Sequence, residues 1–299
     1  MLTDHTPVEL PRPRTAYALL TSAAEIAIVF VHGYYGNAHS TWVDFQHLVD
    51  QPIGGSPVWG KSDLYFYDYG TNGQVQPLAE ELRSFLRDMV LPGGALANAA
   101  RPRSFLFPSG FSLQLPLATP SAYKRLVLVG HSAGAVLIRQ LIVEELKSME
   151  SEDGELSPKI SSSPIATASL RFFAPAHLGV LGAGLLGIGL NLQLLNVVAS
   201  LLVHSNSLFK SLTPGGPVLQ DLKSLTERYY EKYPIIPALK ADSLFGHDDT
   251  VVIIGNYSHE KVHGTIPGQN HTSICKPTML FTKPLEFVTD GLLAATTTK

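Results

Sequence analysis

RLVLVGHSAG, residues 125–134, is the most informative stretch of this chain. Its first half, Leu126 to Val129, is an apolar, β-branched run that is typical of a fully buried strand. The second half, G-H-S-A-G at 130–134, is followed at once by the helical pattern AVLIRQLIVEELKS. G-x-S-x-G between a strand and a helix favours a nucleophile elbow, a tight turn that lifts Ser132 above the sheet edge. A glycine-rich turn without a chemical role is the alternative.

A second buried strand is predicted at Ile26 to Val31 (IAIVFV), which runs directly into a His-Gly-Tyr turn at 32–34. The loop after such a strand, together with the residue after the nucleophile, supplies the backbone N–H groups of an oxyanion hole in serine hydrolases. Tyr34 and Ala133 are therefore the candidate donors. Gly33 lets the backbone approach a substrate closely, so Gly33 and His131 are the candidate substrate-binding residues. The alternative is a glycine turn beside a structural histidine.

Strands and helices alternate along the rest of the chain. Further strands are predicted at 64–69, 168–174, within 235–245 and at 261–266, and helices at 41–49, 76–90, 135–148, 218–230 and 277–293. This alternation predicts an α/β fold with a mostly parallel central sheet flanked by helices. A chain of 299 residues with 45% hydrophobic content is expected to form a single domain over 1–299. Two insertions interrupt the pattern, a proline-rich one at about 92–122 and a second at about 176–213.

The second insertion contains 178–203, a run of 26 residues without a charge. By length alone this run could cross a membrane as a helix. Its five glycines, at 179, 182, 184, 187 and 189, argue against that, because each costs a helix interior roughly 1 kcal/mol. We expect a glycine-rich hinge and an apolar helix that form a lid over the cleft and make transient contact with a lipid surface. A buried helical hairpin of the core is the alternative.

Composition excludes several classes of protein. The formal net charge is −3 and only 16% of residues are charged, so there is no basic surface that would indicate a nucleic acid partner. The single cysteine, Cys275, excludes an intramolecular disulfide and is expected to be a small buried side chain. Acidic residues and prolines interrupt the first twenty residues, which do not read as a signal peptide and favour a cytoplasmic protein. Nothing in the sequence indicates an oligomeric state.

Three kinds of residue that cooperate in nucleophilic catalysis occur in the order Ser132, an aspartate, His271, each just after a predicted strand. Serine is a weak nucleophile, so a neutral imidazole must take its proton, and a buried carboxylate must orient that imidazole. Asp249 fits a G-x-x-D-x-V-V spacing and Asp248 a D-x-T-V spacing; we favour Asp249. His177 precedes both aspartates, which is the wrong order for this role, and is expected to be structural or to line the cleft.

Metal binding is not expected. His247, His259 and His263 lie close together in the sequence, but no metal-ligand spacing on a predicted helix supports a metal site.

Taken together, five segments resemble serine esterases and lipases of the α/β-hydrolase superfamily. They are FVHGYYGN (30–37), LVGHSAG (128–134), APAHLG (174–179), the Gly-Asp-Asp turn (246–249) and QNHTSICKP (269–277). Within that superfamily the chain is most similar in motif to the lipase group of the GPI inositol-deacylase-like proteins and related bacterial lipases. The resemblance implies an α/β-hydrolase fold, hydrolysis of hydrophobic esters or lipids, and no cofactor. The proline-rich insertion at about 92–122 has no counterpart in that pattern.

The sequence therefore predicts a serine carboxylic-ester hydrolase that works through an acyl-serine intermediate. An acyltransferase or a thioesterase would use the same residues with another acceptor or substrate, since one fold hosts many chemistries. A catalytically silent hydrolase fold that serves as a binding module is the alternative from a different class. The presence of serine, aspartate and histidine together with the Gly33 turn disfavours it.

Overall fold

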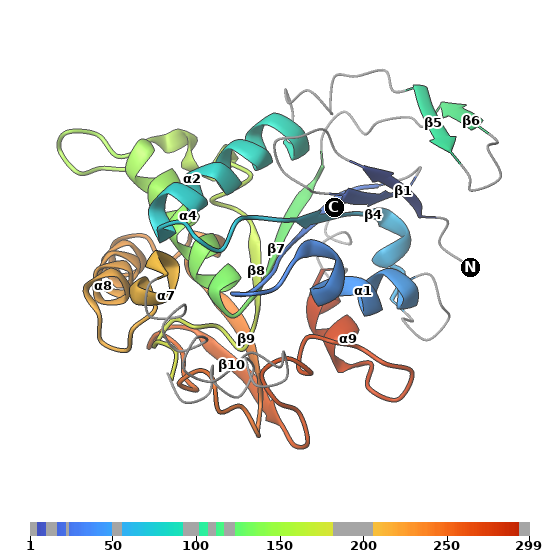
Figure 1. Cartoon of the computed structure of the whole chain (residues 1–299). Coiled ribbons are helices and arrows are strands. Elements are labelled where there is room, and N and C mark those ends of the chain that lie inside the picture. Colours follow the sequence, from blue (N-terminus) through green and yellow to red (C-terminus); the bar gives the residue numbers. More distant parts are fainter. Residues whose placement is uncertain are drawn as a thin grey trace.

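The computed structural model describes residues 5–9, 17–21, 24–49, 56–91, 102–106, 112–116, 123–181 and 206–292. Within these ranges eight strands form one sheet in the order β1-β2-β4-β3-β7-β8-β9-β10 (Figure 1). Their bounds are β1 Thr6–Glu9, β2 Tyr17–Leu20, β3 Ile26–Val31, β4 Ser62–Tyr67, β7 Arg125–His131, β8 Ser169–Phe173, β9 Ala241–Gly246 and β10 Lys261–Ile266.

Strand direction divides this sheet into two parts. β2 runs antiparallel to both of its neighbours, β1 and β4. From β4 to β10 every neighbouring pair is parallel. Parallel neighbours need crossover connections; these contain helices except between β9 and β10, where the described residues 247–260 form turns and loop. A separate antiparallel pair, β5 (Pro102–Leu106) and β6 (Ser112–Pro116), lies within the proline-rich insertion.

Helices cover both faces of the sheet (Figure 1). α2 (Val75–Phe85), α4 (Ala133–Ser148), α7 (Ser207–Ser211) and α8 (Pro217–Lys232) lie on one side, and α1 (Ala38–Leu48) and α9 (Lys283–Thr289) on the other. The two aromatic residues that end β8 show why both faces must be covered, because successive side chains of a strand point to opposite faces. Phe173 contacts Phe45 of α1 and Phe287 of α9, whereas Phe172 faces Arg139 of α4.

The mostly parallel sheet flanked by helices confirms the predicted fold class, and β3 and β10 have the predicted bounds. Several predicted bounds are wrong. The last helix covers only 283–289 rather than 277–293, since 277–282 form turns and Gly291, at φ 70°, ends it. The strand within 235–245 begins only at Ala241, because a short 3-10 turn at Pro237–Leu239 precedes it. The helix expected over 76–90 ends at Phe85 and continues as a π turn to Val90.

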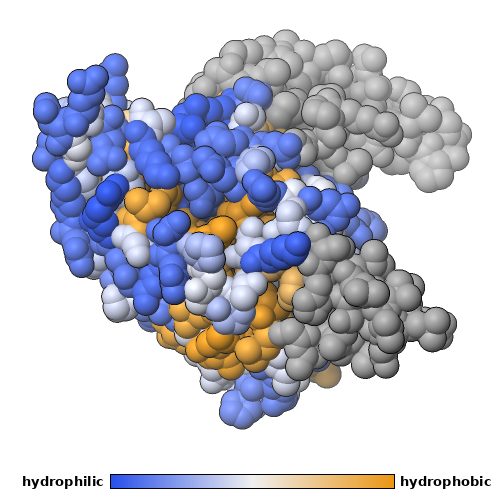
Figure 2. Space-filling model, turned by 60° about the vertical axis from the view of Figure 1, so that its left-hand side comes forward, coloured by the Kyte–Doolittle hydropathy of each residue, from blue (hydrophilic) through white to orange (hydrophobic). Residues whose placement is uncertain are grey.

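The surface of the described part is mixed, and Figure 2 shows orange apolar areas between blue hydrophilic ones on one face. No helix among the described ranges is long and apolar enough to cross a membrane. The lid predicted in the second insertion falls mostly on 182–205, which lie outside the described residues. The single-domain prediction for 1–299 likewise stays a prediction.

Candidate active site

A strained turn joins β7 to α4 at Ser132. The serine has φ 52° and ψ −117°, a conformation that residues with a side chain rarely adopt. Two glycines make the turn possible. A Cβ on Gly130 would lie 2.7 Å from the Ala135 Cα, and one on Gly134 would collide with the carbonyl oxygens of Val31 and His32. This turn therefore requires glycine at both positions and leaves the Ser132 side chain at the carboxyl end of β7.

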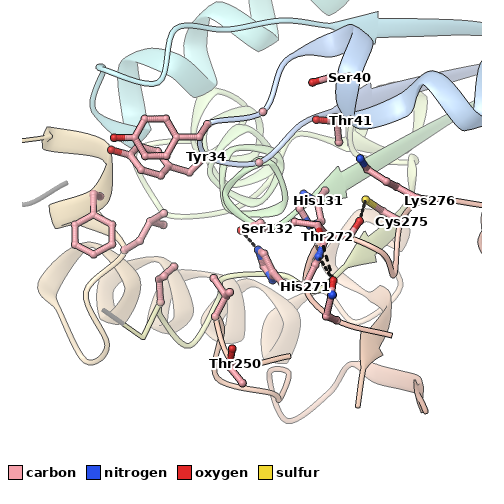
Figure 3. Close-up of a pocket in the computed structure, with 18 of the residues that line it drawn as sticks. Tyr34, Ser40, Thr41, His131, Ser132, Thr250, His271, Thr272, Cys275 and Lys276 are labelled. Atoms are coloured by element: carbon pink, nitrogen blue, oxygen red, sulfur yellow. Dashed lines mark hydrogen bonds between the residues drawn. The ribbon is translucent and has the colours of Figure 1, made fainter. Parts of the chain in front are cut away.

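Ser132, His271 and Asp249 are joined by two hydrogen bonds, and Figure 3 shows the one between Ser132 and His271. Ser132 Oγ lies 3.0 Å from His271 Nε2, and His271 Nδ1 lies 2.9 Å from Asp249 Oδ2. The other carboxylate oxygen, Oδ1, accepts hydrogen bonds from the backbone amides of Val251 and Val252 at 2.8 and 3.2 Å. All three members of the chain are buried. The imidazole is thus placed between a hydroxyl that can lose a proton and a carboxylate that fixes the ring.

Of the two aspartates that the sequence left open, the structure brings Asp249 to His271. Asp248 is exposed, and its backbone amide donates to the carbonyl of Gln269. Burial raises the pKa of the Asp249 carboxyl, but the hydrogen bond from His271 and those from the Val251 and Val252 amides outweigh it. The net pKa lies below the usual aspartate value, so this carboxyl is ionised at neutral pH.

The turn after β3 packs directly against the elbow. A Cβ on Gly33 would lie 2.9 Å from both Ser132 Cβ and His131 Nδ1, so a side chain there would press on the serine. The backbone amides of Tyr34 and Ala133 donate to no carbonyl of the described backbone. An amide at the first position of a helix has no partner within the helix, which explains Ala133. Within the described part of the chain, neither N–H group has a backbone partner.

His131 lines the same cavity and also holds the neighbouring loop. Its Nε2 donates to the carbonyl oxygen of His271 at 2.8 Å, and the two rings lie 4.8 Å apart. Burial, followed by the nearby His271, lowers the pKa of His131 to about 3. His131 is therefore neutral and fixes the backbone of the loop that carries His271.

The sequence analysis did not predict a second histidine–aspartate pair, His32 with Asp68, which lies next to the Gly33 turn. His32 is fully buried and stacks on Tyr69. Its Nε2 lies 2.6 Å from Asp68 Oδ1 and its Nδ1 lies 2.8 Å from the Gly33 carbonyl oxygen. The only available signal was that Asp68 directly follows β4, the strand that pairs with β3. This pair holds the Gly33 carbonyl and with it the turn that carries the Tyr34 amide.

A cavity of about 470 Å³ opens at Ser132. Apolar and aromatic side chains form one wall: Tyr34, Tyr35, Val180, Phe209, Leu212 and Val251. Polar side chains form the rest of the lining: Ser40, Thr41, Asp248, Thr250, Asn270, Thr272 and Lys276, together with Cys275. In Figure 3 Tyr34 lies on one side of Ser132 and His271, and Thr41, Cys275 and Lys276 lie on the other. This volume is within the range of small-molecule sites.

His177, His259 and His263 do not line this cavity. His177 is buried, stacks on Tyr257 and lies 3.4 Å from the carbonyl oxygen of Ala135, which makes it a structural residue. The letters H-E-K-V-H at 259–263 match a zinc-protease motif, which requires a helix to bring its histidines onto one face. Here the second half of the motif lies in β10, His259 stacks on Tyr230, and His263 faces Asp290. Across the described ranges, no three His, Cys, Asp or Glu side chains are placed to hold a metal ion.

This strand order, with one reversed strand near the edge and a G-x-S-x-G turn after a central parallel strand, is the α/β-hydrolase fold. No model of a known protein family matches the sequence, and no curated protein matches it.

Solved structures with a similar backbone path include lipases and hydrolases. Lipase BlEst2 of Bacillus licheniformis in its mature form has 16% sequence identity and a TM-score of 0.48, and the match covers 94% of each chain. A predicted CIB-like hydrolase from Thermoplasma acidophilum has 14% identity and a TM-score of 0.45, with 95% of this chain and 93% of that one covered. A monoacylglycerol lipase of Paleococcus ferrophilus has 11% identity and a TM-score of 0.47, with 93% and 98% covered.

Proposed function

We propose that this protein is a serine carboxylic-ester hydrolase, with Ser132 as nucleophile, His271 as general base and acid, and Asp249 as the group that orients the imidazole. The observation that carries the proposal is the buried hydrogen-bonded chain from Ser132 Oγ through His271 to Asp249, which opens on a cavity. Each residue type has the chemistry that its role needs.

The reaction has two halves. In the first, Ser132 Oγ bonds to the acyl carbon as its proton passes to His271 Nε2. The bond from that carbon to the alcohol oxygen then breaks, and the departing oxygen keeps the electron pair and takes the proton from His271. In the second half, water gives a proton to His271 and attacks the acyl carbon. The bond to Ser132 breaks, Ser132 recovers its proton, and the carboxylic acid leaves.

The tetrahedral intermediates of both halves carry a negative oxygen. The Tyr34 and Ala133 amides, which have no partner in the described backbone, would donate to this oxygen. One donor of this kind is worth about 10²–10³ in kcat. The close approach of Gly33 to Ser132 keeps the Tyr34 amide near the reacting atom. Asp249 stays ionised beside the imidazolium that forms in each half.

The apolar wall of the cavity fits a hydrophobic acyl group. On its motifs we propose that the chain is similar to the GPI inositol-deacylase-like lipases. Contact with a lipid surface through the second insertion belongs to the same proposal, and Leu181, at the edge of the described part of that insertion, is 41% exposed.

The test is a rate profile on p-nitrophenyl esters from acetate to palmitate, with Ser132→Ala as the matched control. Removing the nucleophile costs on the order of 10⁶ in kcat, so the variant should be inactive on every ester. A fluorophosphonate that labels the wild type and not the variant would identify Ser132 as the activated nucleophile. Labelling without hydrolysis of any ester would favour the acyltransferase alternative over ester hydrolysis. Wild-type rates no higher than those of the variant, without labelling, would overturn the proposal.

A further inference from the structure

The two walls of the cavity differ in charge as well as in polarity. Lys276 is the cationic side chain of the polar wall. It is only partly exposed, and in the described part of the chain its ammonium group forms no ion pair. A lysine on an open surface is ordinarily fully solvated, whereas this one lines the cavity that contains Ser132.

The position of Lys276 relative to His271 is fixed by the backbone. The amide of Ile274 donates to the Asn270 carbonyl, and the amide of Lys276 donates to the Ser273 carbonyl, so the chain from 270 to 276 makes consecutive turns. In Figure 3 the side chain of Lys276 runs from this loop toward Thr41. The ammonium is thus carried by the same rigid loop as the imidazole.

Among the described residues, no carboxylate forms an ion pair with this ammonium group. Burial raises the pKa of the Cys275 thiol to about 12, so the thiol is neutral. His131 is also neutral, because burial lowers its pKa. Asp44, one turn after Thr41 in α1, does not line the cavity, although its charge contributes to the raised pKa of Cys275. Asp248 lines the cavity but makes no ion pair with Lys276.

The direction of the reaction decides which part of a substrate meets Lys276. His271 hands its proton to the departing alcohol oxygen, so the alcohol part of the ester must lie on the His271 side of Ser132. The acyl part then lies against the apolar wall. The alcohol part faces the wall that contains Thr41, Thr272 and Lys276.

We propose, on the basis of the ester-hydrolase function proposed above, that the substrates are acyl esters whose alcohol part carries a negative charge, which Lys276 binds. A phosphate and a carboxylate share this chemistry. Lys276 is accordingly a specificity-determining residue, and its contribution appears in the preference between charged and neutral alcohols.

The experiment compares three butyryl esters with the same scissile bond: 1-butyrylglycerol, its 3-phosphate, and butyryl glycerate, in which a carboxylate replaces the phosphate arm. The measured quantity is the ratio of kcat/KM for each charged ester to that for the neutral ester. Because both rates come from one preparation, the ratio does not depend on the folded fraction. A hydrogen bond to a charged group predicts a ratio about tenfold lower in Lys276→Gln, and lower again in Lys276→Glu.

Lys276→Arg should keep the preference, and Lys159→Gln, an exposed lysine outside this cavity, is the charge-matched control. In the wild type the ratio should also fall as ionic strength rises. If the ratio falls for the phosphate ester alone, Lys276 binds a phosphate. If it falls for the glycerate ester alone, Lys276 binds a carboxylate. If it falls for both esters, Lys276 binds either anion. Ratios that stay the same in Lys276→Gln and Lys276→Glu overturn the inference. Hydrolysis of no ester above the Ser132→Ala level overturns the ester-hydrolase function instead.

Discussion

Asp249→Asn should remove the activity and leave the fold intact. The carbonyl oxygen of the new side-chain amide can take over the hydrogen bonds that Asp249 Oδ1 accepts from the Val251 and Val252 amides. The NH₂ group then faces His271 Nδ1, where the carboxylate oxygen stood at 2.9 Å. Since two donors cannot face each other, Nδ1 must be unprotonated and the ring proton must be on Nε2.

That tautomer points a proton at Ser132 Oγ, 3.0 Å away, so the imidazole cannot act as a base. An Asp-to-Asn change of this kind lowers kcat by about 10⁴, or about 5 kcal/mol in activation free energy. The assay is the steady-state rate on p-nitrophenyl butyrate, with thermal unfolding of both proteins followed by circular dichroism. The midpoints of unfolding should be similar.

Asp248→Asn is the control, because Asp248 is a neighbouring aspartate whose side chain is exposed. Asp248 also lines the cavity, but no hydrogen bond joins its carboxylate to His271, so the kcat of Asp248→Asn should fall far less than that of Asp249→Asn. The reasoning would be refuted if Asp249→Asn kept more than about a tenth of the activity, or if Asp248→Asn lost as much, since the tautomer argument requires a loss of about 10⁴ at Asp249 alone.

Three further outcomes follow from buried groups. Gly33→Ala places a Cβ against Ser132 and should lower kcat/KM at least about tenfold, since overpacking costs roughly 1–3 kcal/mol; an unchanged kcat/KM contradicts this. Glu260→Gln leaves the buried Arg139 unpaired and should lower the unfolding free energy in urea by about 3–5 kcal/mol. The double variant Arg139→Met/Glu260→Leu should lose much less unfolding free energy, because no charge is left without a partner. A loss as large as that of Glu260→Gln would show that the unpaired charge is not the cause. Burial, and then Arg139, lower the pKa of His177 from 6.5 to about 3, so the unfolded state binds its proton first as the pH falls through this window. Stability should drop by up to about 1.4 kcal/mol per pH unit, and His177→Gln should remove that part of the slope in urea titrations.

Much of the fold could be predicted from local patterns. The strand at 26–31 and the strand–turn–helix around 125–148 have continuous apolar runs and a glycine motif, which are properties of neighbouring residues. β1 and β2 were not predicted, because they are four residues each and too short to show a period. The last helix was predicted too long because apolar residues before Lys283 continue its pattern although they form turns.

For the candidate site, chain order and strand ends pointed to Ser132, an aspartate and His271. The choice between Asp248 and Asp249 could not follow from spacing, because both fit a motif and adjacent side chains point in different directions. Backbone geometry decided it: the amides of Val251 and Val252 hold one oxygen of Asp249 and turn the other to His271.

Periodicity and motif spacing act between residues close in the chain, which is why the letters alone predicted the parallel sheet and the elbow. Contacts across a hundred residues or more do not leave such a signal. Tertiary packing alone brings Arg139 to Glu260, which is 121 residues away. It alone also places Lys276 at the cavity that contains Ser132. The physical reason is that burying a charge costs free energy unless an opposite charge or a ligand compensates it, and the fold determines which residues lie close enough to do so.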